Sequence, residues 1–236
     1  MKKKIVFIMN PISGTSSKAA VPSLIDSTLD KEQFEYEIKM TERPEHASEL
    51  AAEARDNHAD IVVAVGGDGT VNEVARSLVH SDSALGILPC GSGNGLARHL
   101  LLPMNLKKSI EIINACEIHD LDYGVINEYP FFCTCGMGFD AFVSMKFAES
   151  GKRGPISYAE NILREGLKYE PETYTLEDET GTKQYKAFLI SCANASQYGN
   201  NAYIAPQASM SDGLMDVVIM EPFDVIAASQ VSFDML

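Results

Sequence analysis

The sequence predicts an α/β protein in which a doubly wound parallel sheet is followed by a mainly antiparallel β-sandwich. Three observations support this prediction. Short apolar runs alternate with amphipathic helical stretches over about the first 120 residues. Glycine-rich loops follow several of these runs. After Ile118, further strand-like segments succeed one another, several of them through short turns. We therefore expect two domains, residues 1–118 and residues 119–236.

In the first domain, apolar runs bounded by turn residues predict four strands, and amphipathic stretches predict five helices. The strands are Ile5–Met9, Phe34–Met40, Ile61–Val65 and Ala84–Leu88, and the helices are Lys18–Leu29, Glu45–Asn57, Thr70–His80, Leu96–Leu101 and Leu106–Ala115. In a parallel sheet of this kind, ligands bind beyond the carboxyl ends of the strands.

The second domain is predicted to be rich in short strands. These are Asp120–Ile126, Phe131–Cys135, Tyr174–Glu177, Lys183–Cys192 and Met215–Met220, with helices at Phe139–Ala148 and Ile156–Leu167. Glu179–Thr182 has the composition of a hairpin turn. The apolar residues of this domain suit a lipid pocket or a plain core equally well, and their periodicity does not choose between the two.

Composition excludes several functional classes. The net charge of −14 argues against general nucleic-acid binding and against electrostatic docking on anionic lipid, so any contact with phosphate or membrane must be local. No apolar run approaches the ~20 residues of a membrane span. The five cysteines lack zinc-site spacing, and we expect free thiols in a reducing cytosol.

Three loops with ligand-binding composition are expected at the same edge of the sheet: Asn10–Gly14, Gly66–Thr70 and Gly91–Gly95. Glycines bring main-chain N–H groups close to a ligand, and the helix expected to start at Thr70 adds its positive dipole end. These features predict a phosphate site, although a tight strand-to-helix turn without a ligand is the alternative at Gly66.

The acid within the second loop narrows the chemistry. The loop has no Gly-Lys-Ser/Thr and so differs from a Walker A motif. A carboxylate at Asp68 beside phosphates implies bound magnesium, or an acid that positions or deprotonates an incoming hydroxyl. Arg98, about one turn past the third loop, could neutralise phosphate charge or be a surface arginine.

The three motifs together resemble a known family. Asn10-Pro11-x-Ser13-Gly14, Gly66-Gly67-Asp68-Gly69-Thr70-x-Asn72-Glu73 and Pro89-x-Gly91-Ser92-Gly93-Asn94-x-x-Ala97-Arg98 are similar to the diacylglycerol kinase catalytic domain, whose superfamily includes bacterial lipid kinases and the sphingosine and ceramide kinases. The resemblance continues through Gly136–Ala141 and Ala193–Asp216, in family order.

The resemblance implies a kinase that uses ATP and Mg²⁺ to phosphorylate a lipid hydroxyl, with a fold of the NAD kinase and lipid kinase type. Asp68 is then expected to organise the phosphates and the metal ion. In the second domain it implies magnesium held by Asp212 and by the carbonyls of Ser209 and Leu214, although an Asp-Gly turn alone would explain this loop. The residues expected to bind ATP are Asn10, Ser13, Gly14, Thr41, Gly66, Gly67, Asp68, Gly69, Thr70, Asn72, Glu73, Gly91, Ser92, Asn94 and Arg98.

The end of the chain departs from the family pattern. Family members normally continue past the position of Leu236 and carry an Asp-Gly-Glu motif that acts in or near proton abstraction, and this motif is absent from the sequence. We therefore expect a C-terminally truncated β-rich lipid-substrate domain, nucleotide binding that exceeds turnover, and exposed edges that favour a homo-oligomer.

Several alternatives stay open at this level. One is a catalytically silent nucleotide-binding or regulatory protein, and another is a kinase of the NAD kinase type. The lipid could be diacylglycerol, a long-chain base, a ceramide-like lipid or an undecaprenol-type alcohol. We expect a cytoplasmic protein that visits the membrane surface transiently.

Overall fold

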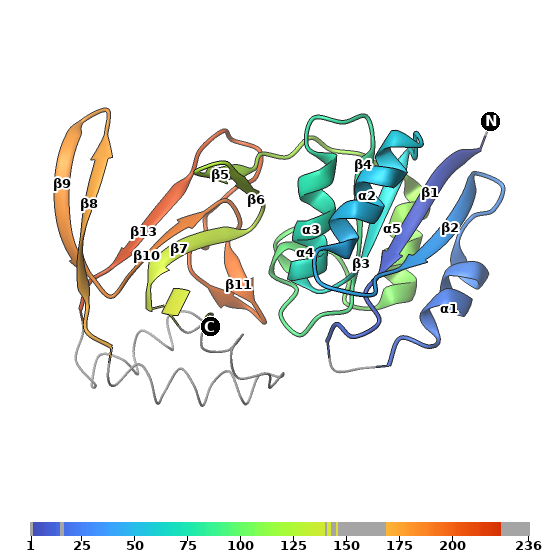
Figure 1. Ribbon diagram of the computed structural model, residues 1–236, viewed down its shortest axis with the longest axis horizontal. Helices are drawn as coiled ribbons and strands as arrows, with labels where there is room; N and C mark the ends of the chain where they lie inside the picture. Colours follow the sequence, from blue (N-terminus) through green and yellow to red (C-terminus); the bar gives the residue numbers. More distant parts are fainter. Residues whose placement is uncertain (1, 15–16, 140, 143–144, 146–168, 223–236) are drawn as a thin grey trace.

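The computed structural model describes residues 2–14, 17–139, 141–142, 145 and 169–222. The described residues form two lobes that lie side by side, with the helix-rich first lobe joined to a strand-rich second lobe (Figure 1). Among these residues, no helix combines the length and the apolarity that crossing a bilayer requires.

The first lobe is built on a four-stranded parallel sheet with the strand order β2-β1-β3-β4. Apolar, β-branched runs form its two central strands, which are buried on both faces. The strands are β1 (Lys3–Met9), β2 (Phe34–Met40), β3 (Ile61–Gly66) and β4 (Ala84–Pro89), and the helices are α1 (Val21–Thr28), α2 (His46–Asp56), α3 (Asp68–Leu78), α4 (Gly95–His99) and α5 (Leu106–Ala115).

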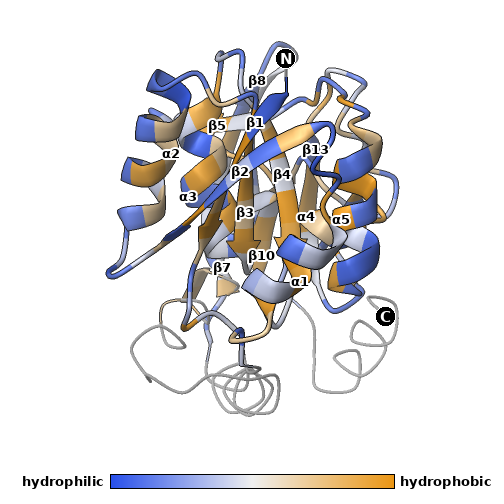
Figure 2. Ribbon diagram, turned by 90° about the vertical axis from the view of Figure 1, so that its right-hand side faces the viewer, coloured by the Kyte–Doolittle hydropathy of each residue, from blue (hydrophilic) through white to orange (hydrophobic). Residues whose placement is uncertain are grey.

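Alternate residues of each central strand pack against opposite helix layers. In β1, Val6 and Ile8 belong to the core under α2 and α3, whereas Ile5, Phe7 and Met9 belong to the core under α1 and α5. Figure 2 shows this sandwich, with apolar strands between helices whose polar faces point outward. The doubly wound α/β fold expected for this part of the chain is confirmed.

The second lobe consists of short antiparallel pairings. Its largest described sheet has the order β13-β10-β7, and two-stranded ribbons surround it. The strands are β5 (Gly124–Ile126), β6 (Tyr129–Phe131), β7 (Thr134–Gly138), β8 (Glu172–Asp178), β9 (Gly181–Ala187), β10 (Leu189–Ala193), β11 (Gln197–Gly199), β12 (Ala202–Tyr203) and β13 (Asp216–Met220). The mainly antiparallel second region is therefore confirmed, including the hairpin turn between β8 and β9.

Three predicted strands of this lobe are wrong in extent. The predicted strand Phe131–Cys135 covers the end of β6 and the start of β7, with Phe132 and Cys133 outside both strands. The predicted strand Lys183–Cys192 is two strands, because the chain bends at Phe188 and leaves its hairpin partner to join a different sheet. The Phe188 N–H donates to Met220 and its carbonyl accepts from Phe139 at this bend. Of Asp120–Ile126, only β5 is a strand, since the Asp122 N–H instead donates to the carbonyl of Met210.

The two helices predicted in the second lobe lie wholly or largely outside the described residues. Ile156–Leu167 lies wholly outside them. Of the other, only Phe139, Ala141, Phe142 and Met145 are described, and these four are helical.

The lobes share a core. Ala195 and Met210, from the second lobe, are buried within the cluster formed by the sheet, α2 and α3 of the first lobe. Leu96 and Ala97 of α4 belong to the same cluster, and α4 packs on β11. This contact positions the second lobe directly beside the loops at the carboxyl edge of the sheet.

Candidate active site

The three predicted ligand loops meet at one edge of the parallel sheet. The register pairs Met9 with both Met40 and Val65, so β1, β2 and β3 end at the same level. Backbone hydrogen bonds then extend the ladder by one step, from Asn10 to Val65 (3.1 Å), from Thr41 to Met9 (2.9 Å) and from Cys90 to Gly66 (2.7 Å). Every predicted loop therefore begins at the same height above the sheet.

Glycines allow these loops to touch. A Cβ on Gly91 would lie 2.4 Å from the Cα of Gly67, closer than real Cβ atoms approach a backbone. Gly14 has φ of +67°, and its Cβ would lie 2.1 Å from the Cys90 carbonyl oxygen. The first and second loops thus both rest on the third, and side chains at these positions would separate them.

Asn10 connects the first loop to α3. Its Oδ1 accepts a hydrogen bond from the Ile12 N–H (3.1 Å), and its Nδ2 donates to Oγ1 of Thr70 (3.4 Å). Thr70 was expected to start this helix, and that expectation is wrong. α3 begins two residues earlier with Gly67 at its N-cap, and Thr70 is a buried residue of its first turn.

Asp68 lies where two helices begin. It is the first residue of α3, and its carboxylate accepts hydrogen bonds from the backbone N–H groups of Asn94, Gly95 and Leu96 at the start of α4. The Leu96 contact is 3.4 Å from Oδ1. Burial raises the pKa of Asp68, although these N–H donors act in the opposite direction. The site therefore contains a partly desolvated acid held by the third loop.

The third loop is tied both internally and to the second lobe. Asn94, in the left-handed conformation, closes it by accepting from the Gly91 N–H (2.8 Å) and donating to the Gly91 carbonyl (2.9 Å). Arg98 donates through Nε to Gly93 (3.1 Å) and through Nη1 to Asn201 of the second lobe (3.3 Å). Arg98 thus clamps the loop to its neighbour rather than projecting freely from the surface.

The remaining predicted ATP residues lie around this edge. Ser13 is buried and donates through Oγ to the carbonyl of Asn10, Thr41 is buried at the end of β2, and Ser92 is exposed at the tip of the third loop. Gly69 and Asn72 belong to the first turns of α3. The Glu73 carboxylate accepts from the Ala47 N–H (3.1 Å) and so caps α2.

The predicted metal residues lie together in an exposed loop of the second lobe. Oδ1 of Asp212 accepts from the Leu214 N–H (3.0 Å), which is an Asx turn, and Ser209 contacts Ser211 through its hydroxyl (3.3 Å). A second carboxylate joins the loop, because Asp122 accepts from the Gly213 N–H (2.8 Å). Within the described part of the chain, no cluster of three or more histidine, cysteine, aspartate or glutamate residues forms a metal site.

Comparison with known families agrees with this geometry. The profile described as "Diacylglycerol kinase catalytic domain" matches residues 4–126, a span that contains all three loops. The chain belongs to the diacylglycerol kinase catalytic domain family. The profile described as "YegS C-terminal NAD kinase beta sandwich-like domain" matches residues 133–231.

Individual proteins of this family extend the comparison. "Lipid kinase YegS" from Escherichia coli K12 and "Probable lipid kinase YegS" from Escherichia fergusonii are each 28% identical over 207 residues, covering 85% of this chain and 69% of theirs. A crystal structure titled as a diacylglycerol kinase from Bacillus anthracis superposes with a TM-score of 0.74 at 21% identity, covering 97% of this chain and 77% of that one. This last match supports the fold.

Sequence reasoning missed contributors to this candidate site. Lys18 is buried at the same edge, and its ammonium donates to the carbonyl of Ser13. Gly199 and Asn201 support the third loop from the second lobe, where a Cβ on Gly199 would lie within 2.8–2.9 Å of Gly93. Gly199 and Asn201 lie within Ala193–Asp216, a segment that only the family resemblance indicated. No local pattern pointed to Lys18.

A thiol completes the surroundings of Asp68. Burial, together with the nearby charge of Asp68, raises the pKa of Cys133 to about 12. Cys133 is therefore a neutral thiol at physiological pH, and it donates its proton toward the carbonyl of Gln197 at 3.2 Å. Both residues belong to the second lobe, and Cys133 packs against the core cluster of the first lobe. Asp68 is therefore the local negative charge.

Proposed function

We propose that this protein is an ATP- and Mg²⁺-dependent kinase that transfers the γ-phosphate to a lipid hydroxyl. The observation that carries the proposal is the meeting of three glycine loops around Asp68 at the carboxyl edge of a parallel sheet. Phosphoryl transfer depends mainly on positioning and on electrostatic stabilisation, and an edge of this kind supplies backbone donors and one acid.

Individual residues take distinct roles in this proposal. The backbone N–H groups of the Gly66–Thr70 loop, with those of Ser92 and Gly93 in the third loop, bind phosphate oxygens at the start of α3. Asn10, Ser13, Gly14 and Thr41 shape the adjoining wall. Arg98 stiffens the third loop and adds positive charge beside it. Asp68 orients the phosphates and their metal ion, while Glu73 supports the site by capping α2.

The donors near Asp212 fit a hard cation. The loop offers carboxylate and carbonyl oxygens at Asp212, Ser209 and Leu214, with Asp122 close by, and Mg²⁺ and Ca²⁺ prefer oxygen ligands. When bound, such an ion neutralises charge and fixes the loop. The chain's own contribution is to hold these oxygens through the Asx turn at Asp212 and the Asp122–Gly213 contact.

A lipid acceptor is the class that the relatives' names favour, since both enterobacterial relatives are named lipid kinases. We extend this to the present chain together with a cytoplasmic location and transient contact with the membrane surface. Diacylglycerol and sphingoid-type lipids are the acceptors to test first.

The test is transfer of labelled γ-phosphate from ATP to a panel of lipids in detergent micelles, with NAD as a soluble acceptor, for the wild type and Asp68→Asn. We expect a lipid product from the wild type. The rate of transfer should be at least about a hundredfold lower in the variant, because removing one key electrostatic group from an active site typically has an effect of this size. Phosphorylation of NAD with no lipid product would refute the proposal.

Folding of Asp68→Asn provides the control for this test. The pKa of Asp68 is higher in the folded than in the unfolded protein, so its contribution to stability is present below the unfolded pKa and is lost as pH rises through the folded pKa. At neutral pH the charged carboxylate therefore costs stability. Asp68→Asn should melt no lower than the wild type, so that lost transfer reports chemistry.

A second candidate is nucleotide binding without transfer. It is favoured by the engagement of the Asp68 carboxylate with the N–H groups of Asn94, Gly95 and Leu96, which leaves fewer free lone pairs for a metal ion. Nucleotide binding by the wild type without a product on any lipid or on NAD would select this candidate.

A further inference from the structure

The backbone after α4 places a leucine where the fold prefers glycine. The Leu101 N–H donates to Arg98 (3.0 Å) and the Leu102 N–H donates to Ala97 (2.9 Å), which together form a Schellman motif. Leu101 occupies its left-handed position with φ of 56°, where a Cβ is unfavourable. Ala97 belongs to the core cluster of the first lobe and Leu102 packs against the same cluster, in keeping with the apolar contact of the motif. Leu101 is not part of this cluster.

The side chain of Leu101 is not buried against the rest of the described structure. It is 87% exposed, the largest exposure among the large apolar side chains that the structure describes. The other described non-glycine residues at positive φ are polar residues or a cysteine, whereas Leu101 is the aliphatic one. A residue that strains the backbone and exposes an apolar side chain is better explained by a partner outside this chain.

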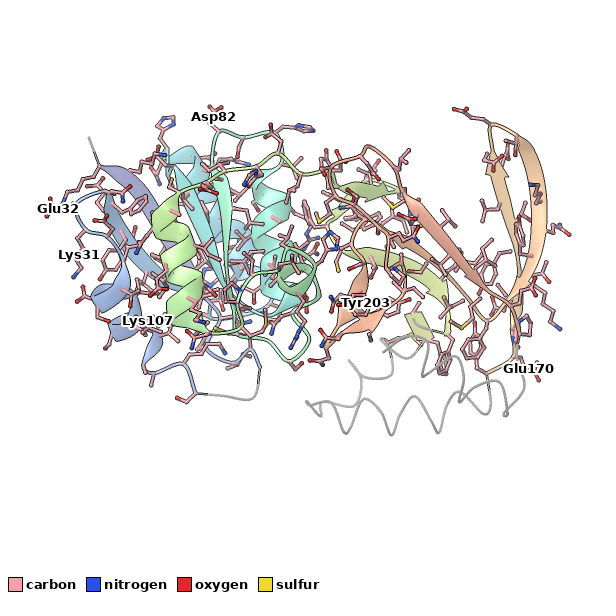
Figure 3. All side chains as sticks on the ribbon, turned by 180° about the vertical axis from the view of Figure 1, so that it is seen from behind. Lys31, Glu32, Asp82, Lys107, Glu170 and Tyr203 are labelled. Atoms are coloured by element: carbon pink, nitrogen blue, oxygen red, sulfur yellow. The ribbon has the colours of Figure 1, made fainter. Side chains whose placement is uncertain are left out.

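The position of this leucine is informative. The segment from Leu101 runs beside the third glycine loop, since Asn94 Nδ2 lies 3.8 Å from Met104 Sδ. α5 then ends at the opposite edge, where Lys3 Nζ contacts Cys116 Sγ at 3.2 Å. The first turn of α5 therefore lies on the carboxyl side of the sheet. Figure 3 shows Lys107 at the end of the lobe opposite to Asp82, which precedes β4.

Two lysines in this turn also lie at a helix position that is unfavourable for positive charge. Lys107 and Lys108 are exposed in the first turn of α5, where the helix dipole disfavours cations and where no acid is present. With Glu111 in the next turn, they are the charged residues of α5, so this helix carries a net charge of +1 in a chain of net charge −14. Leu101, Met104, Lys107 and Lys108 thus present apolar and cationic groups together at the edge that holds the candidate site.

We propose that this surface, residues 101–108, docks the protein on an anionic lipid bilayer. The apolar side chains of Leu101 and Met104 enter the interfacial region of the bilayer, while Lys107 and Lys108 contact the anionic headgroups. Another exposed apolar area around Val125, Ile126 and Tyr129 has Asp120, Asp122 and Glu128 near it in sequence, and such acids repel anionic lipid. The inference rests on the proposed function and adds the face by which a lipid acceptor is reached.

The first test is co-sedimentation with phosphatidylcholine vesicles, with and without phosphatidylglycerol. We expect the wild type to bind the phosphatidylglycerol vesicles. Each lysine near an anionic surface contributes about fivefold in binding, so Lys107→Glu/Lys108→Glu should weaken it by at least about 25-fold. Leu101→Ser should weaken it by about tenfold.

Matched variants on other surfaces serve as controls. Lys183→Glu/Lys186→Glu makes the same charge change on the exposed strand β9, and Ile118→Ser removes a side chain that is 58% exposed. Both controls should bind vesicles as the wild type does. Failure of the wild type to bind, or equal losses in the control pairs, would overturn the inference. Self-association that Leu101→Ser abolishes would assign the surface to a second copy instead and would also overturn it.

Leu101→Gly separates docking from folding. Glycine relieves the left-handed strain, so this variant should melt roughly 2 °C higher than the wild type while binding vesicles less tightly. A lower melting temperature with unchanged vesicle binding would contradict the inference.

Transfer assays keep this inference distinct from the proposed function. With lipid in detergent micelles, Leu101→Gly and Lys107→Glu/Lys108→Glu should phosphorylate it as the wild type does, and with lipid in anionic bilayers they should be at least fivefold slower. Absence of transfer from the wild type in micelles counts against the proposed function. Equal bilayer rates for wild type and variants count against the docking surface.

Discussion

At the scale of single residues, the candidate site depends on where side chains are missing. Gly91 and Gly67 are in backbone contact, and Gly14 lies on the Cys90 carbonyl. Gly91→Ala would force the second and third loops apart, and overpacking of this kind costs about 1–3 kcal/mol. We expect that loss in the free energy of unfolding, together with weaker nucleotide binding, measured by denaturant unfolding and titration with a fluorescent ATP analogue.

Gly69→Ala is the matched control for stability. Gly69 lies inside α3 with open space around its Cβ position, and a helix-interior Gly-to-Ala change gains up to about 1 kcal/mol. It should therefore be as stable as the wild type or more stable. If Gly91→Ala proved equally stable, the close approach of the two loops would not be a constraint on the fold.

Residues that act through sequence neighbours were predictable, and residues that act through tertiary contacts were not. Asp68 and the glycines around it form one uninterrupted motif, so the pattern alone located them. Asp122 and Asn201 reach the candidate sites only because the fold brings distant segments together. Lys18 is local to the first loop, but no motif marks a buried lysine there. Glu73 shows the converse, since it lies in the motif but its carboxylate caps another helix.

At the scale of elements, α2 and α3 are locked together by polar contacts near the site. The Glu73 carboxylate accepts from the Ala47 N–H at the start of α2. The Ser48 hydroxyl donates to the Glu73 carbonyl (3.0 Å), and the Ser77 hydroxyl donates to the Ser48 carbonyl (2.9 Å). Loss of a helix cap costs about 1 kcal/mol, so Glu73→Ala should lower stability by that amount.

Glu73→Gln distinguishes capping from ligand binding. Glutamine keeps an acceptor for the Ala47 N–H, so most of the stability should return, and nucleotide affinity should stay within about twofold of the wild type if capping is the role of Glu73. Calorimetric titration with ATP and thermal melting provide both readouts. A large loss of ATP affinity in Glu73→Gln with normal stability would instead make the charge itself part of the binding site.

Element prediction succeeded where periodicity was long and failed where pairing was non-local. Phe34–Met40 and Leu106–Ala115 match the observed β2 and α5, because alternation and helical spacing are properties of the segment itself. The division at Phe188 depends on which partners β9 and β10 find, and those partners are far away in sequence. The start of α3 was misplaced by two residues because its N-cap is Gly67, which has no side chain to mark a helix start in the sequence.

At the scale of the whole molecule, the two lobes are held as one unit by buried groups. Ala195 and Met210 complete the core of the first lobe, and α4 with the third loop contacts β11. His99 adds a polar connection, because its Nδ1 accepts from the Ser196 N–H (3.1 Å) and lies 3.0 Å from the Ser196 hydroxyl. Loss of the His99–Ser196 contact would therefore affect both the junction between the lobes and α4, whose first residues hold Asp68.

This junction should weaken in mild acid. Burial lowers the pKa of His99, so the folded protein holds its imidazole neutral while the unfolded chain gains a proton below about pH 6.5. The contribution of His99 is thus fully present above that pH and is lost as pH falls toward the folded pKa. His99→Asn keeps an acceptor near Ser196 without titrating, and the gap in unfolding free energy between wild type and variant should narrow between about pH 7 and 5. Denaturant unfolding at each pH measures it. A gap that stays constant would show that protonation of His99 is not linked to folding.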